Sequence, residues 1–254
     1  MRLFFLLSLI LLVPAPPAAA AETLRLVISD QAGMPYLTDT DKADGGLPGL
    51  AVELVQLAAQ ACDITLKIDR LPSLRSLQAL RNGTEDAMLL LSYNPERAVY
   101  AHYPLRDGQP DGRYRLATLS YSFFVQRGSG ISWDGKQLLG YDGKVGTDLG
   151  WSVVRDLAQL GIPVENAVGV ETNLAKLRKG RIRVYAAQNI LVDTYLKNSD
   201  DIVALSPPIA TRDYFLPFNR LYAQYHPQVV HCLWQQIASQ REPLYRQRAR
   251  AYGL

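Results

Sequence analysis

The chain alternates short apolar segments with helical segments, and this order occurs twice. In the first unit, residues 24–29, 64–68 and 87–91 are apolar runs of the length of buried strands. Residues 50–62 have apolar side chains at helical spacing, and a second helix is predicted from Ser73 to Asn82-Gly83. Strands that alternate with helices in this way are typical of a mainly parallel α/β sheet.

The second unit begins at residue 143. Residues 143–147 and 182–187 are predicted strands, and residues 152–160 form a predicted helix that ends before a glycine. Thr172 is the predicted N-cap of another helix, which runs to Lys179. Two similar α/β units in 254 residues indicate two lobes.

Two extended, aromatic-rich stretches, residues 115–126 and 214–218, are predicted to be hinge strands that join the lobes. Residues 227–252 are predicted to be mostly helical. These assignments predict the domain organisation. Residues 1–21 are a leader, and residues 22–118 form the first part of lobe 1. Residues 119–207 form lobe 2, and residues 208–254 return to lobe 1 with C-terminal helices.

The N-terminus predicts export. Arg2 precedes an apolar run over residues 3–13, and a proline-rich turn and four alanines, Ala18 to Ala21, follow. A charge, a short apolar core and small residues describe a secretory signal peptide, with cleavage after Ala20 or Ala21. An uncleaved anchor is the alternative, although the apolar core is shorter than the roughly 20 residues that a membrane span needs. The expected location is the periplasm.

Composition excludes several classes of function. Lys and Arg total 27 against 24 Asp and Glu, so the near balance of charge gives no case for binding nucleic acid. The three histidines are scattered, and no spacing of metal ligands appears, so no cofactor is expected. In an exported protein Cys62 and Cys232 either form a disulfide or remain two separate buried thiols.

Residues 91–97 (LSYNPER) are the sharpest local feature. A strand ends, Asn94 suits an N-cap and Pro95 suits the first helical position. Arg97 then places a planar guanidinium, which can hold a carboxylate with two charge-assisted hydrogen bonds, next to the predicted helix start. The alternative is a surface arginine after a well-capped helix.

The second unit repeats this geometry after its first strand. Asp148-Leu149-Gly150-Trp151 leads into a helix near Ser152. Gly150 permits close approach of a ligand to the backbone, and Trp151 either stacks on the ligand or packs beneath it. Ligands of α/β sheets bind at the carboxyl ends of strands, so the two helix starts could face each other across a cleft.

The residues from 22 to 254 resemble the extracellular solute-binding proteins of family 3, the polar amino-acid binding proteins of ABC importers. The resemblance is carried by the order and spacing of several short motifs. These are Asp30, Pro35-Tyr36, residues 49–57, Leu80-x-x-Gly83-x-x-Asp86, Asn94-Pro95-Glu96-Arg97, residues 143–146, Gly150-Trp151-Ser152 and Gly180-Arg181-Ile182. The resemblance implies an α/β, two-lobed periplasmic-binding-protein-like fold of type II, with two hinge strands and with a mainly parallel sheet flanked by helices in each lobe.

The resemblance also implies roles for nine residues. Arg97, helped by Ser92, would hold the ligand carboxylate, and Gly150, Trp151 and Ser152 would close on it from the other lobe. The remaining ligand-binding positions are Tyr36 as an aromatic wall, Asp30 at the ligand side chain, Leu90 with its carbonyl at the ammonium, and Gln188 where the family has an ammonium-binding Asp.

Departures from the family pattern mark a divergent member. The family commonly has Thr at the position of Asn94. Gln188 can accept a hydrogen bond from an ammonium but cannot neutralise it, and a buried unpaired charge is costly. Asp148 or Asp193 could supply the missing charge. Arg183 stands where the family has Asp, as structural drift or as an added positive charge near the cleft.

Three functions are weighed. The leading one is a monomeric binding protein, not an enzyme, that captures a small carboxylate-bearing ligand by hinged closure and serves an ABC permease. The second is a sensory or partner module that has kept the fold and lost the ligand. The third is a periplasmic dehydratase-like enzyme, for which Glu171, Asp148 and His102 are the candidate acids or bases.

Overall fold

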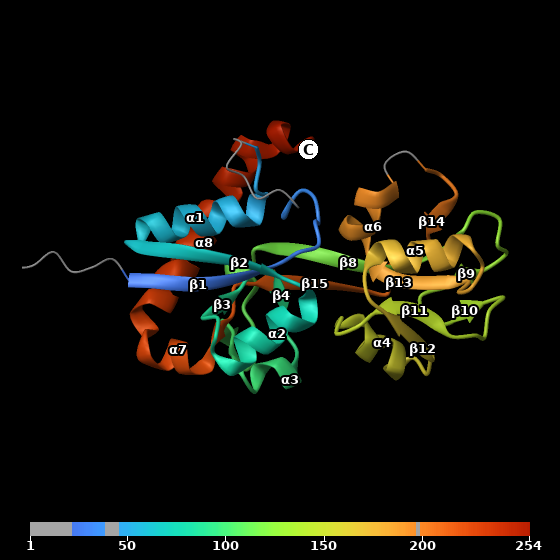
Figure 1. Ribbon diagram of the computed structural model, residues 1–254, viewed down its shortest axis with the longest axis horizontal. Helices are drawn as coiled ribbons and strands as arrows, with labels where there is room; N and C mark the ends of the chain where they lie inside the picture. Colours follow the sequence, from blue (N-terminus) through green and yellow to red (C-terminus); the bar gives the residue numbers. More distant parts are fainter. Residues whose placement is uncertain (1–21, 39–45, 197–198) are drawn as a thin grey trace, which may run out of the picture.

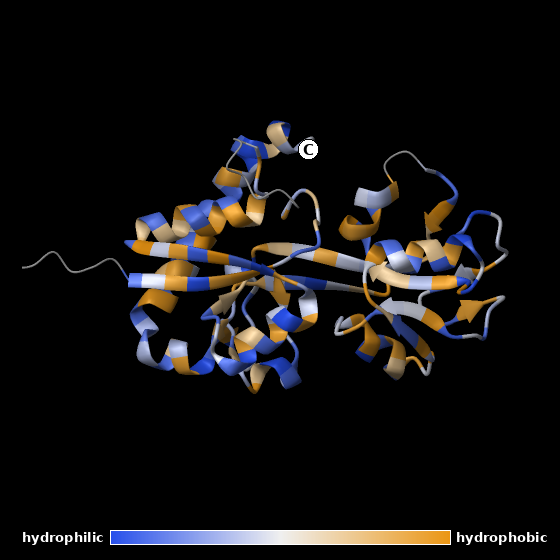
Figure 2. Ribbon diagram, viewed as in Figure 1, coloured by the Kyte–Doolittle hydropathy of each residue, from blue (hydrophilic) through white to orange (hydrophobic). Residues whose placement is uncertain are grey.

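The computed structural model describes residues 22–38, 46–196 and 199–254. The predicted signal peptide, residues 1–21, lies outside the described residues. The described chain forms two lobes that lie side by side and are joined by long strands (Figure 1). Apolar residues concentrate in the strands and in the helix faces that cover them (Figure 2).

The sheet of lobe 1 has the order β2-β1-β3-β16-β5. Strand β1 (Glu22–Ser29) pairs in parallel with β2 (Ile64–Leu71) and β3 (Ala87–Met88). Strand β16 (Phe218–Asn219) pairs antiparallel with β3 and with β5 (Ala101–His102). The sheet is therefore parallel where the chain enters the lobe and antiparallel where the chain returns to it.

Helices cover both faces of this sheet (Figure 1). Leu24, Leu26 and Ile28 of β1 are buried in one cluster with α1 (Leu50–Ala61) and α8 (Pro227–Arg248). Val27 points to the other face, where it packs near Leu80 of α2 (Ser73–Asn82). Alternate residues of a strand face opposite sides, so burial on both faces explains the continuous apolar run in this strand.

A disulfide joins the helices that cover the first face. Cys62 caps the end of α1 and Cys232 lies in α8, and their Cα atoms are 6.1 Å apart. The two residues are 170 positions apart in the sequence. Of the two sequence alternatives, the structure has the disulfide.

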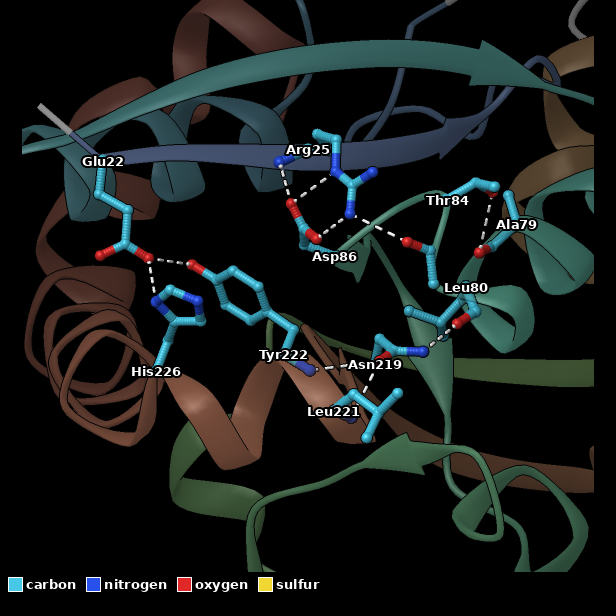
Figure 3. Close-up of polar contacts among 11 residues, drawn as sticks. Glu22, Arg25, Ala79, Leu80, Thr84, Asp86, Asn219, Leu221, Tyr222 and His226 are labelled. Carbon is cyan, nitrogen blue, oxygen red and sulfur yellow. Dashed lines mark hydrogen bonds and ion pairs between the residues drawn. The ribbon is translucent and has the colours of Figure 1, made fainter.

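Polar contacts tie the returning chain to lobe 1 (Figure 3). Asn219 caps α7 (Arg220–Tyr225) and its amide also donates to the carbonyl of Leu80 at 2.8 Å. The Tyr222 hydroxyl donates to Glu22 at the start of β1, at 3.0 Å. These contacts explain why the segment after lobe 2 returns to lobe 1.

The sheet of lobe 2 has the order β12-β11-β13-β8-β15-β4. Strands β12 (Val164–Ala167), β11 (Val145–Asp148) and β13 (Val184–Gln188) are parallel. Helices α5 (Val170–Arg178) and α6 (Asn189–Leu196) pack on one face with Tyr185, and α4 (Val153–Gln159) packs on the other with Val184.

Strands β8 (Ala117–Gln126) and β15 (Ala210–Phe215) are antiparallel partners and run between the lobes (Figure 1). Strand β8 lies within the first predicted hinge stretch, residues 115–126, whereas the second predicted stretch, residues 214–218, shares only the end of β15 and runs on to β16. Strand β4 (Leu91–Ser92) pairs with the end of β15, which places the chain before Arg97 beside the hinge. The lobe boundaries at 118/119 and 207/208 stay predictions.

The remaining elements are short. They are α3 (Pro95–Ala98), β6 (Leu105–Arg106), β7 (Gln109–Pro110), the 3-10 turn η1 (Gly112–Tyr114), β9 (Ser132–Trp133), β10 (Leu138–Leu139), β14 (Ile202–Ala204) and the 3-10 turn η2 (Ala249–Tyr252). Among the helices of the described residues, none is both long enough and apolar enough to cross a bilayer.

Two local expectations were wrong. The N-cap expected at Thr172 lies three residues earlier, at Gly169, whose φ of 90° turns the chain into a helix that begins at Val170. The strand expected over residues 87–91 is two short strands, β3 and β4, that belong to different sheets. Leu90, with φ of 57°, interrupts it, since this left-handed conformation cannot continue a strand.

Candidate functional site

A cavity of about 100 Å³ lies between the lobes. Lobe 1 contributes the segment from β3 to Ser92, residues of α2 and Arg97, and lobe 2 contributes Gly150-Trp151 and the start of α6. Most of the lining side chains are apolar. The lining residues are Ser29, Gln31, Gly33, Leu37, Ser73, Leu77, Met88, Leu89, Leu90, Leu91, Ser92, Arg97, Leu119, Tyr121, Gly150, Trp151, Gln188, Ile190, Leu191 and Tyr214.

Leu90 marks the point where the chain leaves one sheet for the other. The change of direction places residues 88–92 along the cavity wall. A non-glycine residue with positive φ is uncommon and often lies at a functional position. The break between β3 and β4 at Leu90, which the sequence did not reveal, therefore lies within the wall of the cavity.

Hydrogen bonds at the start of α3 fix the position of Arg97 in the cavity wall. The Asn94 side chain accepts from the Arg97 backbone N–H at 2.7 Å, as the predicted N-cap requires. The guanidinium is buried, and its Nη1 donates to the carbonyl of Ser92 at 3.0 Å and to the Ser92 Oγ at 2.9 Å. Arg97 is therefore a fixed buried cation and not the surface arginine of the alternative interpretation.

The same guanidinium reaches the other lobe, because its Nη2 donates to the carbonyl of Gly150 at 3.2 Å. These three hydrogen bonds use both Nη1 protons and one of the two Nη2 protons. Among the described residues, no hydrogen bond engages the Nε proton or the second Nη2 proton. A carboxylate could accept hydrogen bonds from these two N–H groups.

Lobe 2 approaches closely at Gly150. This residue has φ of 83°, and a Cβ there would come within 2.7 Å of the Leu74 side chain of α2. Nearby, the Ser92 hydroxyl donates to the Ser152 hydroxyl at 3.4 Å. Ser92, Arg97, Gly150 and Ser152 therefore meet where the two lobes touch.

A chain of hydroxyls and an amide forms another part of the wall. Gln188 Nε2 donates to the Tyr214 hydroxyl at 2.5 Å and to the Tyr121 hydroxyl at 3.3 Å. Tyr214 in turn donates to Tyr121 at 3.2 Å, and Trp151 packs edge-on against the Tyr121 ring, with ring centroids 5.9 Å apart. Complete burial raises the pKa of Tyr121 well above its ordinary value, so this hydroxyl keeps its proton.

Three of the nine candidate residues, Asp30, Tyr36 and Ser152, are not among those that line the cavity. Asp30 is exposed beyond the end of β1. Tyr36 packs against Tyr245, with ring centroids 5.9 Å apart. The structure brings together Leu90, Ser92, Arg97, Gly150, Trp151 and Gln188 in the wall, with Ser152 in contact through Ser92.

The other charged residues that the sequence suggested near the cleft also lie outside the cavity wall. Asp193 is exposed on α6, and Arg183 is exposed and donates to the carbonyl of Ser129. Neither of them lines the cavity, so Arg183 adds no positive charge to its wall. The three candidate acids and bases for an enzyme, Asp148, Glu171 and His102, do not line it either.

Sequence reasoning missed the tyrosine pair and the aliphatic walls. Tyr121 and Tyr214 lie in β8 and β15, whose aromatic richness was noted only as a sign of hinge strands. Leu77, Leu119, Ile190 and Leu191 look like ordinary core residues in the sequence. Their place in the wall depends on how the lobes meet, for which the sequence carries no signal.

Asp148 is an unusual buried acid just behind the cavity wall. It is 2% exposed, and its Oδ2 accepts from the Tyr185 hydroxyl at 2.5 Å. Burial raises the pKa of this carboxyl from its ordinary 3.8 to about 6, against the opposing effect of the hydrogen bond from Tyr185. The folded state therefore holds this proton more tightly than the unfolded chain does.

The substitution Asp148→Asn is expected to stabilise the protein at pH 7.5 by roughly 1–3 kcal/mol, because one pKa unit is worth about 1.4 kcal/mol. The native carboxyl binds more protons than the unfolded one between about pH 4 and pH 6, so its contribution to stability falls as the pH rises through that window. Urea unfolding at pH 4, 6 and 7.5 measures the effect, with exposed Asp142→Asn as the matched control. A variant that is less stable than wild type at pH 7.5 would show that the ionised carboxylate is well accommodated.

Comparison with solved structures identifies the fold of the chain. No protein-family model and no curated protein sequence matches the chain. A solved substrate-binding protein of an amino acid ABC transporter superposes with a TM-score of 0.70 at 14% identity, over 91% of this chain and 98% of that one. The chain has the two-lobed fold of periplasmic binding proteins.

Other solved structures share this two-lobed fold. The substrate-binding protein AbpA from Streptococcus pneumoniae, solved with L-arginine, has a TM-score of 0.69 at 14% identity and covers 91% of this chain and 94% of its own. A histidine kinase sensor domain similar to periplasmic binding proteins has a TM-score of 0.68 at 16% identity, with coverages of 91% and 96%. The two-lobed fold therefore occurs both in transport proteins and in a sensor.

Proposed function

We propose that this chain is a periplasmic solute-binding protein that captures a small carboxylate-bearing molecule between its lobes and presents it to an ABC permease. One observation supports this more than any other. Arg97 is a buried cation in the wall of the interlobe cavity, with two N–H groups that the described residues leave unused. A buried cation without an anion is costly, and a ligand carboxylate would remove that cost.

The ligand would bind first to the lobe 1 side, where Ser92 already orients the guanidinium. Closure of lobe 2 then adds the contact between Arg97 and the Gly150 carbonyl and the contact between Ser92 and Ser152. Because these contacts join the two lobes, they exist only in the closed form. A ligand that fits the closed cavity shifts the open–closed equilibrium by its difference in affinity for the two states.

Periplasmic location is part of the proposal and rests on the predicted signal peptide and on the disulfide, which is typical of oxidising compartments. The sensor domain with the same fold supports a second candidate, in which the closed form is read by a signalling partner instead of a permease. Both candidates require ligand capture at the same cavity.

A thermal-shift screen of small carboxylic acids tests the proposal, followed by titration calorimetry on those that respond. The panel holds amino acids, dicarboxylates, 2-oxo acids and aliphatic and aromatic monocarboxylates, each beside its neutral amide. Ligand at 100 times its Kd should stabilise the protein by about 2.7 kcal/mol, and the amides should have no effect. If no acid in the panel raises the midpoint, or if amides act as well as acids, carboxylate capture is wrong.

A further inference from the structure

The charges of the residues that line the cavity indicate the net charge of the ligand. Arg97 is the only charged residue among the lining residues that the structure describes, and none of these is Asp or Glu. An amino acid brings a carboxylate and an ammonium and so has no net charge in this cavity. A carboxylate without an ammonium brings the single negative charge that balances Arg97.

The position where the family resemblance implies an ammonium-binding Asp holds a neutral amide here. Gln188 is nearly fully buried, and its Nε2 donates to Tyr214 and Tyr121. The amide oxygen can accept hydrogen bonds, but it carries no charge with which to offset the desolvation of an ammonium. Tyr121 accepts from both Gln188 and Tyr214, and Ser152 is a further hydrogen-bond partner of its hydroxyl.

Asp148, the nearest acid in the chain to Gly150, does not correct the balance. Its carboxyl faces away from the cavity, into the core of lobe 2, where Tyr185 donates to it, and it is not a lining residue. Beside the uncharged polar side chains of Ser29, Gln31 and Ser73, most of the remaining wall is hydrocarbon, from Leu77, Leu89, Leu119, Ile190 and Leu191, with the indole of Trp151. Such a wall favours an apolar body on the ligand.

We infer that the cavity takes a monocarboxylate with an apolar body and no ammonium, such as a branched or aromatic 2-oxo acid or the corresponding simple acid. This inference rests on the proposed function and names the ligand class of the same site. Arg97 binds the carboxylate, and the aliphatic wall covers the hydrocarbon.

Two matched sets of acids test the inference by titration calorimetry with the mature chain. One set is leucine, 4-methyl-2-oxopentanoate and 4-methylpentanoate, and the other is phenylalanine, phenylpyruvate and 3-phenylpropanoate. Within at least one set, the acids that lack nitrogen should bind at least about tenfold more tightly than the amino acid, a difference of about 1.4 kcal/mol.

The substitution Gln188→Glu should reverse this order, because it adds an anion where the ammonium would lie. It should strengthen binding of the amino acid and weaken binding of its nitrogen-free partners by at least about tenfold each, the effect of adding or opposing one charge in a desolvated site. Gln159→Glu, an exposed position on α4, makes the same chemical change outside the cavity and should leave the order as in wild type. Thermal unfolding without ligand checks that both variants are folded.

The outcomes separate the inference from the proposed function. If the amino acid binds wild type as tightly as its nitrogen-free partners in every set that binds, the inference is overturned and carboxylate capture stands. If none of the six compounds binds while a hydrophilic acid of the wider panel does, the apolar class is wrong and capture again stands. If neither the six nor the wider panel binds, both fail together.

Discussion

Replacement of Arg97 by methionine is expected to weaken binding of any carboxylate ligand by at least about thirtyfold, since removing one partner of a buried charge pair costs about 2–5 kcal/mol. Methionine keeps the length of the side chain but has no proton to donate. It also loses the bond from Nη2 to the Gly150 carbonyl, which is one of the polar contacts between the lobes. Both effects act in the same direction on the measured Kd.

The measurement is titration calorimetry with the acid that gives the largest thermal shift in wild type. Arg97→Lys should fall between wild type and the methionine variant, because an ammonium keeps the charge but cannot form the two-pronged contact. Arg155→Met, at an exposed position of α4, removes one positive charge elsewhere and should bind like wild type. An Arg97→Met variant that is folded and binds within about threefold of wild type, under 1 kcal/mol, would mean that the carboxylate is held elsewhere.

Removal of the disulfide should have the largest effect on stability. The double variant Cys62→Ala/Cys232→Ala frees a loop closed by residues 170 apart, and a loop of this size is expected to contribute about 3–5 kcal/mol. At about 2–4 °C per kcal/mol for a chain of this length, the thermal midpoint should fall by about 10 °C. The effect arises because α1 and α8 cover the same face of the lobe 1 sheet and the bond limits how far they separate on unfolding.

Thermal unfolding followed by circular dichroism measures this, with and without dithiothreitol. The reductant should lower the midpoint of wild type to that of the double variant and leave the variant unchanged. Neither cysteine lines the cavity, so ligand affinity at 25 °C should not change. A midpoint that is equal in the variant and in oxidised wild type would show that the bond does not constrain the unfolded chain.

Most of the individual elements could be predicted because their signals are local. Asn82-Gly83 ends α2 where expected, since Gly83 adopts the left-handed conformation, with φ of 73°, that closes a helix. Asn94 caps α3 and Pro95 occupies its first position. Each of these signals depends on a few neighbouring residues and their own backbone preferences, so a sequence reveals them without any knowledge of the fold.

The candidate site was predictable only in part. Ser92, Arg97, Gly150 and Trp151 could be named because strand ends and helix starts mark them in the sequence. Tyr121, Tyr214 and Leu119 could not, because a residue in a strand between lobes has the same apolar signature whether it faces a core or a cavity. The interruption at Leu90 was missed for a related reason, since pairing with two different sheets, and not the local sequence, divides that segment.

The sequence by itself determined the α/β alternation, the helix caps and the presence of a guanidinium after a strand end, because these follow from periodicity and backbone preference within a few residues. Only the tertiary structure decided that Cys62 and Cys232 are bonded, that Arg97 is buried against Gly150, and that its cavity has no acid among the described residues. Each of these depends on contacts between segments far apart in the chain, and such contacts are set by how whole sheets and lobes pack.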